Sequence, residues 1–167
     1  MITLILGGVR SGKSELAERL AGTGGAVTYV ATGPTGAGMQ DRIAAHRDRR
    51  PAAWTTVEVT GSDLATMVGA AGGGTLLIDS LGTWVASHPD LDPDVDSLVA
   101  ALDESGAEVV LVSDEVGLSV HPETEVGRRF QDALGTVNRR VSAIADRVLF
   151  VAAGRVIELG PTLETFE

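Results

Sequence analysis

Eight residues near the start of the chain combine glycine, lysine and serine at a spacing that binds nucleotide phosphates. Their order is Gly7-Gly8-Val9-Arg10-Ser11-Gly12-Lys13-Ser14, which fits G-x-x-x-x-G-K-[ST]. In such a loop the backbone N–H groups turn inward around an anion. Lys13 would contact the β- and γ-phosphates, and the hydroxyl of Ser14 would bind Mg²⁺. The alternative is an ordinary glycine-rich turn that opens a helix.

The identity of the cation strengthens the nucleotide interpretation. Lys13 is the only lysine in the sequence, and the other 12 of the 13 basic residues are arginines. A compact ammonium fits inside a loop that wraps phosphates, whereas a planar guanidinium does not. The sequence therefore predicts a catalytic, phosphate-contacting role for Lys13.

Carboxylates follow two apolar runs farther along the chain. Asp79 closes the run 75–79, which has the Walker B form, in which the aspartate reaches the Mg²⁺ of the nucleotide. Apolar runs that end in aspartate are common, so this assignment depends on the P-loop. Asp114 and Glu115 follow the run 108–113 and are expected at the same edge of a sheet.

A basic cluster contains the histidine best placed for chemistry. We predict a short helix over 39–50 that ends before Pro51. Residues at i, i+3 and i+4 share a helix face, and this face carries Arg42, His46, Arg49 and Arg50. Because like charges repel, the cluster suggests an external anion, although a solvated basic face is an equal alternative. His88 is expected in a solvated loop and His121 at a structural or peripheral position.

The surrounding pattern predicts elements that would position these groups. Residues 2–6 form an apolar run before the loop, and helical spacing follows it, so strand, loop and helix come in the order of a P-loop. A second strand over 26–32 implies a parallel β-α-β unit. Ligands of parallel sheets lie beyond the carboxyl ends of the strands. The loop after Thr32 is therefore expected near the P-loop, unless it is a plain surface turn.

The remaining pattern completes an α/β domain. Further strands are predicted over 54–59, 75–79, 108–113 and 148–153, and helices over 63–68, 81–85, 95–102 and 127–145. The tail after Gly154 is expected to form a short hairpin or edge strand. Together these elements predict a three-layer fold with a mostly parallel sheet.

Composition narrows the class of protein. A chain of 167 residues is expected to form one domain, 1–167. The absence of cysteine excludes disulfides and thiolate metal sites. The net charge of −10 argues against nucleic-acid or membrane-surface binding. No apolar run approaches a membrane span and no basic leader is visible, so a cytoplasmic protein without membrane insertion is expected.

The segments in order resemble a known family. They are GGVRSGKS, TYVAT, DRIAAHRDRRPAAWTTVE, LLIDSLGTWV and VVLVSDEVGLSVHPETEVGRRFQDALGTVNRRVSAIADRVLFVAAG. They resemble the bifunctional adenosylcobinamide kinase / adenosylcobinamide-phosphate guanylyltransferase family of cobalamin biosynthesis, over nearly the whole chain. The segments H-x-x-x-R-P-x-x-W and EVG…PE…GRRF…G-x-V-N are the specific parts. This chain has Ser-Asp-Glu-Val-Gly where the family often has Asn-Glu-Val-Gly, and Ser119-Val120-His121-Pro122 where Ile-Val-Pro is common.

The resemblance implies a function and a set of residues. It implies a RecA-like P-loop fold, ATP, GTP and Mg²⁺ as ligands, a corrinoid substrate and a homotrimer. His46 would be the guanylylated histidine, and Ser14 and Asp79 would bind the metal. The implied nucleotide-binding residues are Gly7, Gly8, Val9, Arg10, Ser11, Gly12, Lys13, Ser14, Ala31, Thr32, Gly33, Arg47, Asp48, Arg49, Arg50, Glu58 and Asp79.

Two other functions stay open on the sequence. One is a small-metabolite or nucleotide kinase without a covalent step, in which His46 only contacts phosphate. The other is a GTP-dependent switch or assembly module that binds a protein partner.

Overall fold

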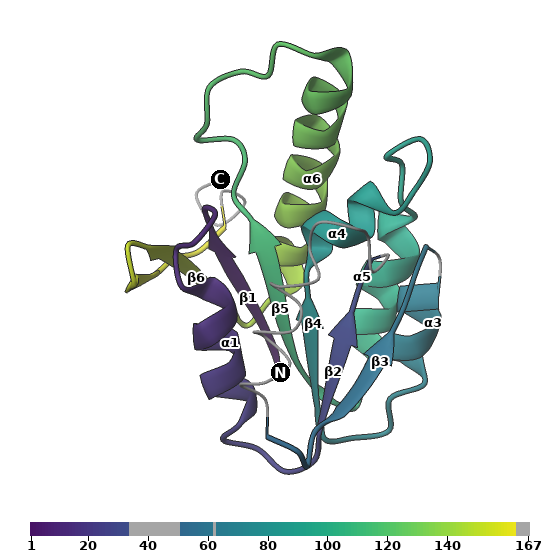
Figure 1. The fold of residues 1–167 in the computed structure, drawn as a ribbon. Coiled ribbons are helices and arrows are strands. Elements are labelled where there is room, and N and C mark those ends of the chain that lie inside the picture. Colours follow the sequence, from purple (N-terminus) through teal and green to yellow (C-terminus); the bar gives the residue numbers. More distant parts are fainter. Residues whose placement is uncertain (34–50, 62, 163–167) are drawn as a thin grey trace.

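A parallel sheet with helices on both faces forms the body of the protein (Figure 1). The computed structural model describes residues 1–33, 51–61 and 63–162. The predicted helix over 39–50 lies outside these ranges. Within them the strand order is β3-β2-β4-β5-β1-β6-β7. The strands are β1 Ile2–Gly7, β2 Val27–Ala31, β3 Thr55–Glu58, β4 Thr75–Asp79, β5 Glu108–Asp114, β6 Arg147–Ala152 and β7 Arg155–Glu158.

All neighbouring strands are parallel except the last pair. The tail folds back as β7, antiparallel to β6, which confirms the hairpin expected there. Across it, Arg147 donates from Nε and Nη2 to the carboxylate of Glu158, at 3.1 and 3.0 Å. These hydrogen bonds hold the pKa of Glu158 below its ordinary value.

The helices have the predicted positions, with small shifts at their ends. They are α1 Lys13–Ala21, α3 Asp63–Gly69, α4 Leu81–Ala86, α5 Val95–Glu104 and α6 Glu125–Ile144. Helix α6 begins two residues before its predicted start, because Thr124 accepts a hydrogen bond from the Gly127 N–H and so caps the helix. None of the helices in the described ranges is long and apolar enough to cross a bilayer.

The central strands bury both faces, which explains their continuous apolar runs. On β1, Leu4 packs with the layer that contains α3, α5 and α6, whereas Ile5 packs with the layer that contains α1. Both side chains are completely buried. Figure 1 shows α1 on one face of the sheet and α3, α5 and α6 on the other. The predicted three-layer architecture is confirmed.

The topology changes one expectation about the second strand. β1 and β2 are parallel, but β5 and β4 lie between them. Three strand spacings of about 4.8 Å put the end of β2 roughly 14 Å from β1 along the sheet. Proximity of Thr32 to the P-loop therefore does not follow from a simple β-α-β unit. Local sequence predicts the strands, whereas long-range packing decides their order.

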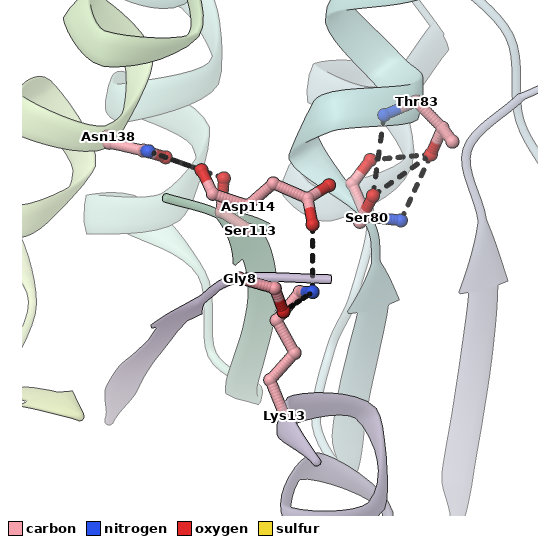
Figure 2. A network of polar contacts seen from close by, with 7 residues as sticks. All are labelled: Gly8, Lys13, Ser80, Thr83, Ser113, Asp114 and Asn138. Carbon is pink, nitrogen blue, oxygen red and sulfur yellow. Dashed lines mark hydrogen bonds and ion pairs between the residues drawn. The ribbon is translucent and has the colours of Figure 1, made fainter. Parts of the chain in front are cut away.

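A buried amide ties α6 to the end of β5 (Figure 2). The hydroxyl of Ser113 donates to Oδ1 of Asn138 at 2.6 Å, and Nδ2 of Asn138 donates to the carbonyl of Asp114 at 3.0 Å. Asn138 is 6% exposed and Ser113 is fully buried. Because buried polar groups are costly when unpaired, this amide fixes the position of the residue that follows Ser113.

We expect Asn138→Ala to lower the free energy of unfolding by about 1–3 kcal/mol, because it leaves a buried hydroxyl and a carbonyl without partners. Urea denaturation measures this loss. Thr136→Ala is the matched control on the same helix, since Thr136 is exposed and donates only to the Asp132 carbonyl. The control should stay within about 0.5 kcal/mol of wild type. Equal losses in the two variants would contradict the role of Asn138.

Candidate active site

The glycine-rich segment forms a tight loop between β1 and α1. Arg10 and Gly12 have positive φ angles of 57° and 101°. The Ser11 N–H donates to the Gly8 carbonyl at 3.3 Å, and the Leu16 N–H donates to the Gly12 carbonyl at 3.0 Å, which starts α1. A loop with left-handed residues at a helix N-terminus makes a concave site for an anion. The structure therefore has the backbone geometry that the motif predicts.

Lys13 is buried at the start of α1 and points back across the loop (Figure 2). Its Nζ donates to the Gly8 carbonyl at 3.0 Å and lies 2.8 Å from Oδ1 of Asp114. Only 7% of the residue is exposed. A buried ammonium requires such partners because its charge is poorly solvated. The lysine is thus held where phosphates would meet the loop.

Asp114 belongs to the site, although it is not among the nucleotide-binding residues predicted from the sequence. The sheet register pairs Gly7 of β1 with Asp114 of β5, so the carboxylate comes directly beside the P-loop. Its position after an apolar run was visible in the sequence. What was missing was the strand order, because only the pairing of β5 with β1 brings Asp114 rather than Asp79 to Lys13.

A second contact supports the loop from β6, the strand that flanks β1 on the side opposite β5. The Gly154 N–H, in the β6–β7 turn, donates to the Ser11 carbonyl at 2.9 Å. The hydroxyl of Ser11 is buried and has no hydrogen-bond partner among the described residues. An unpaired buried hydroxyl inside a P-loop is a group that a polar ligand could satisfy.

Asp79 ends β4 at the same edge of the sheet. The Tyr29 hydroxyl donates to its Oδ2 at 3.1 Å. Because β5 separates β4 from β1, Asp79 lies two strand spacings, roughly 10 Å, from the P-loop strand. Asp79 and the P-loop therefore lie on either side of the end of β5, at the same edge of the sheet.

The donor chemistry at this edge fits magnesium. Mg²⁺ prefers oxygen ligands and is usually held by one or two protein groups together with substrate phosphates. Ser14 offers a hydroxyl and Asp79 a carboxylate. Within the described ranges no group of three or more acidic or histidine side chains could hold a metal by itself. A metal bound mainly through nucleotide phosphates agrees with both observations.

Thr32 has a structural task in the described fold. Its hydroxyl contacts the Ser80 carbonyl and lies 2.9 Å from Oγ1 of Thr83, and the residue is 2% exposed. Ser80 in turn caps α4. The side chain of Thr32 is therefore turned into the fold, and Ala31 and Gly33 on either side of it are partly exposed.

Among the predicted nucleotide residues that the structure describes, Glu58 lies farthest from the P-loop strand. It ends β3, opposite Ala31 of β2, and is exposed. Three strands lie between β3 and β1, so four strand spacings of about 4.8 Å put these two strands roughly 19 Å apart. The described residues therefore bring together the P-loop, Lys13 and Asp114, with Asp79 nearby, but leave Glu58 apart.

The predicted covalent centre lies outside the described residues. This applies to His46 and to Arg47, Asp48, Arg49 and Arg50.

The other two histidines are described. His88 is half-buried rather than solvated, with Nδ1 2.9 Å from the Trp84 carbonyl and its ring edge-on to Trp84, which corrects the expectation for this loop. His121 is exposed and helps line a cavity of about 400 Å³ beside α6.

The fold and the loop together define a P-loop nucleotide-binding protein. Among solved structures, an ATPase from the type III secretion system of pathogenic bacteria matches with a TM-score of 0.55 and 13% identity. The match covers 94% of this chain and 57% of that one, so the chain spans little more than half of the ATPase. It supports the RecA-like P-loop fold and nothing finer.

Sequence comparison gives the family. Residues 3–159 match the family model described as cobinamide kinase / cobinamide phosphate guanyltransferase, and the chain belongs to this family. The bifunctional adenosylcobalamin biosynthesis protein CobP of Pseudomonas aeruginosa is 44% identical, over 92% of this chain and 94% of that protein. CobU proteins of the same description from Salmonella typhimurium and Escherichia coli are 36% and 35% identical, each over 92% of this chain and 97% of the relative.

We expect Gly7→Ala to destabilise the protein by about 1–3 kcal/mol, because a Cβ at this position would lie 2.5 Å from the Val151 carbonyl and 2.7 Å from Ser11 Oγ. A Cβ at Gly8, one residue later, would meet no atom within 4 Å. Gly8→Ala should therefore unfold within about 0.5 kcal/mol of wild type in the same denaturant titration. Equal stability of the two variants would contradict the close packing of Gly7 against β6.

Proposed function

We propose that this chain carries out both reactions named for its family. It would phosphorylate adenosylcobinamide and then transfer GMP from GTP to the product, giving adenosylcobinamide-GDP. The observation that carries the proposal is a buried lysine in a P-loop at the carboxyl edge of a parallel sheet, in a chain that the family model matches over residues 3–159.

In the kinase step the γ-phosphate of ATP or GTP would pass to the aminopropanol hydroxyl of adenosylcobinamide. A bond forms between that oxygen and the γ-phosphorus, the bond to the β-phosphate oxygen breaks, and the hydroxyl proton is released. The loop N–H groups and Lys13 stabilise the charge on the transferring group. Mg²⁺, bound near Ser14 and Asp79, would supply further neutralisation of that charge.

In the second step His46 would act as a nucleophile. An imidazole nitrogen attacks the α-phosphorus of GTP, and pyrophosphate leaves. An oxygen of adenosylcobinamide phosphate then attacks the same phosphorus and releases the imidazole. An ordinary imidazole is substantially neutral at pH 7 and needs no strong activation. Arg47, Arg49 and Arg50 follow it in the sequence and would stabilise charge on the phosphates.

The assembly and setting of the enzyme belong to the same proposal. A corrinoid is large for a domain of this size, so a substrate site at or near a subunit boundary fits a homotrimer like the one implied by the resemblance. We also propose that the protein is cytoplasmic and that the nucleotide contacts implied by the resemblance include Ala31, Thr32, Gly33, Asp48 and Glu58.

We expect wild-type protein incubated with GTP labelled at the α-phosphate to carry label through denaturing electrophoresis and to release pyrophosphate. The bond is a phosphoramidate, so the label should be lost in acid and retained in alkali. His46→Ala should carry no label, yet it should still phosphorylate adenosylcobinamide, because that step uses the P-loop. His88→Ala and His121→Ala are the matched controls and should label normally.

The possible results of this experiment test different parts of the proposed function. Label that persists in His46→Ala, or that is lost in either control, contradicts the assignment of the nucleophile. Wild-type protein that phosphorylates adenosylcobinamide but never carries label is a kinase without a covalent step. Protein that hydrolyses GTP without acting on the corrinoid favours a switch or assembly module.

A further inference from the structure

A carboxylate already holds the P-loop lysine in the structure. Oδ1 of Asp114 lies 2.8 Å from Nζ of Lys13, whose side chain is 8% exposed, whereas the side chain of Asp114 is 33% exposed. An incoming triphosphate therefore meets a negative group beside its own binding site. When the triphosphate binds, its phosphates replace Asp114 as the partner of the Lys13 ammonium, while the carboxylate of Asp114 stays close to them.

The backbone of Asp114 is fixed on several sides. Its carbonyl accepts from Nδ2 of Asn138 at 3.0 Å. The next N–H, that of Glu115, donates to the Gly7 carbonyl at 3.1 Å. Asp114 can therefore turn its side chain, but its backbone cannot move away from the P-loop without breaking these bonds.

The second carboxylate oxygen, Oδ2, faces the first turn of α4. A Cβ added to Gly82, in the first turn of α4, would lie 2.9 Å from Oδ2 of Asp114. The carboxylate thus lies between α4 and Lys13, as Figure 2 shows for its contact with Lys13. Rotation alone leaves its negative charge next to the phosphate site.

The charge of the ligand decides the consequence. A free triphosphate carries roughly four negative charges near neutral pH, since the last proton of a terminal phosphate has a pKa near 6. Its magnesium complex carries about two fewer. Like charges that are brought together in a partly buried site oppose binding, and this opposition acts most strongly on the metal-free form.

We propose that Asp114 is a specificity-determining residue that makes the P-loop reject metal-free nucleotide in favour of the magnesium complex. Its contact with Lys13 sets the carboxylate at the phosphate site, and its charge then selects between the two forms of the ligand. This inference rests on the proposed function, because it requires that the P-loop binds a nucleoside triphosphate.

The test is the ratio of two dissociation constants in the same protein. The β,γ-imido analogues of ATP and GTP are titrated calorimetrically, once with excess Mg²⁺ and once with EDTA. Both constants refer to the same free protein, so any change in its stability cancels from the ratio. Asp114→Asn should bind the metal-free analogue about tenfold or more tightly than wild type does. The ratio of the dissociation constant without metal to that with Mg²⁺ should therefore fall by at least about fivefold.

Two variants serve as comparisons. Asp103→Asn removes the same charge from the exposed end of α5, which precedes β5 and so lies at the opposite edge of the sheet, and should leave the ratio unchanged. Asp79→Asn should also narrow the ratio, but by weakening the magnesium complex.

The outcomes distinguish the inference from the function beneath it. A ratio within about twofold of wild type in Asp114→Asn overturns the inference, provided that wild type binds the magnesium complex. A ratio that narrows only through weaker binding of the magnesium complex also overturns it and makes Asp114 a metal ligand. Wild type that binds neither analogue, even with Mg²⁺, contradicts the proposed function instead.

Discussion

The site depends on one buried positive charge, the ammonium of Lys13. Taking a charge out of water is expensive, and the fold compensates with the Gly8 carbonyl at 3.0 Å and the Asp114 carboxylate at 2.8 Å. These partners also fix where the charge lies. A free lysine on the surface would place its charge anywhere within reach, whereas this one points into the loop that is shaped for phosphates. Preorganised charge of this kind is what transition-state stabilisation requires.

The rest of the fold keeps those partners in place. β5 lies beside β1, so the register brings Asp114 opposite Gly7. Helix α6 contributes Asn138, which holds the end of β5 through one buried and one partly buried hydrogen bond. The β6–β7 turn supports the loop through Ser11. Three distant segments of the chain therefore support the P-loop, and a substitution that disrupts any of them is expected to disturb the site.

The sequence predicted the local part of this arrangement. G-x-x-x-x-G-K-[ST] needs only eight consecutive residues to define its backbone, and apolar runs such as 75–79 and 108–113 are strands because both faces of the sheet are covered. The strand order could not be predicted in the same way, because it depends on how helices pack across the sheet. For this reason Asp114 was recognised as an edge residue but not as the partner of Lys13. The resemblance also implies that Thr32 contacts the nucleotide, and the structure adds that its hydroxyl joins the ends of β2 and β4.

The central claim is that the ammonium of Lys13 binds triphosphate, and Lys13→Ala tests it most directly. Asp114 is partly exposed, so water can solvate its carboxylate when the lysine is removed, and the variant should stay folded by circular dichroism. The affinity for magnesium-complexed ATP or GTP, measured by calorimetry, should fall by at least about tenfold, since a charge-assisted contact is lost. A folded Lys13→Ala variant with wild-type nucleotide affinity and wild-type phosphorylation of adenosylcobinamide would contradict the account.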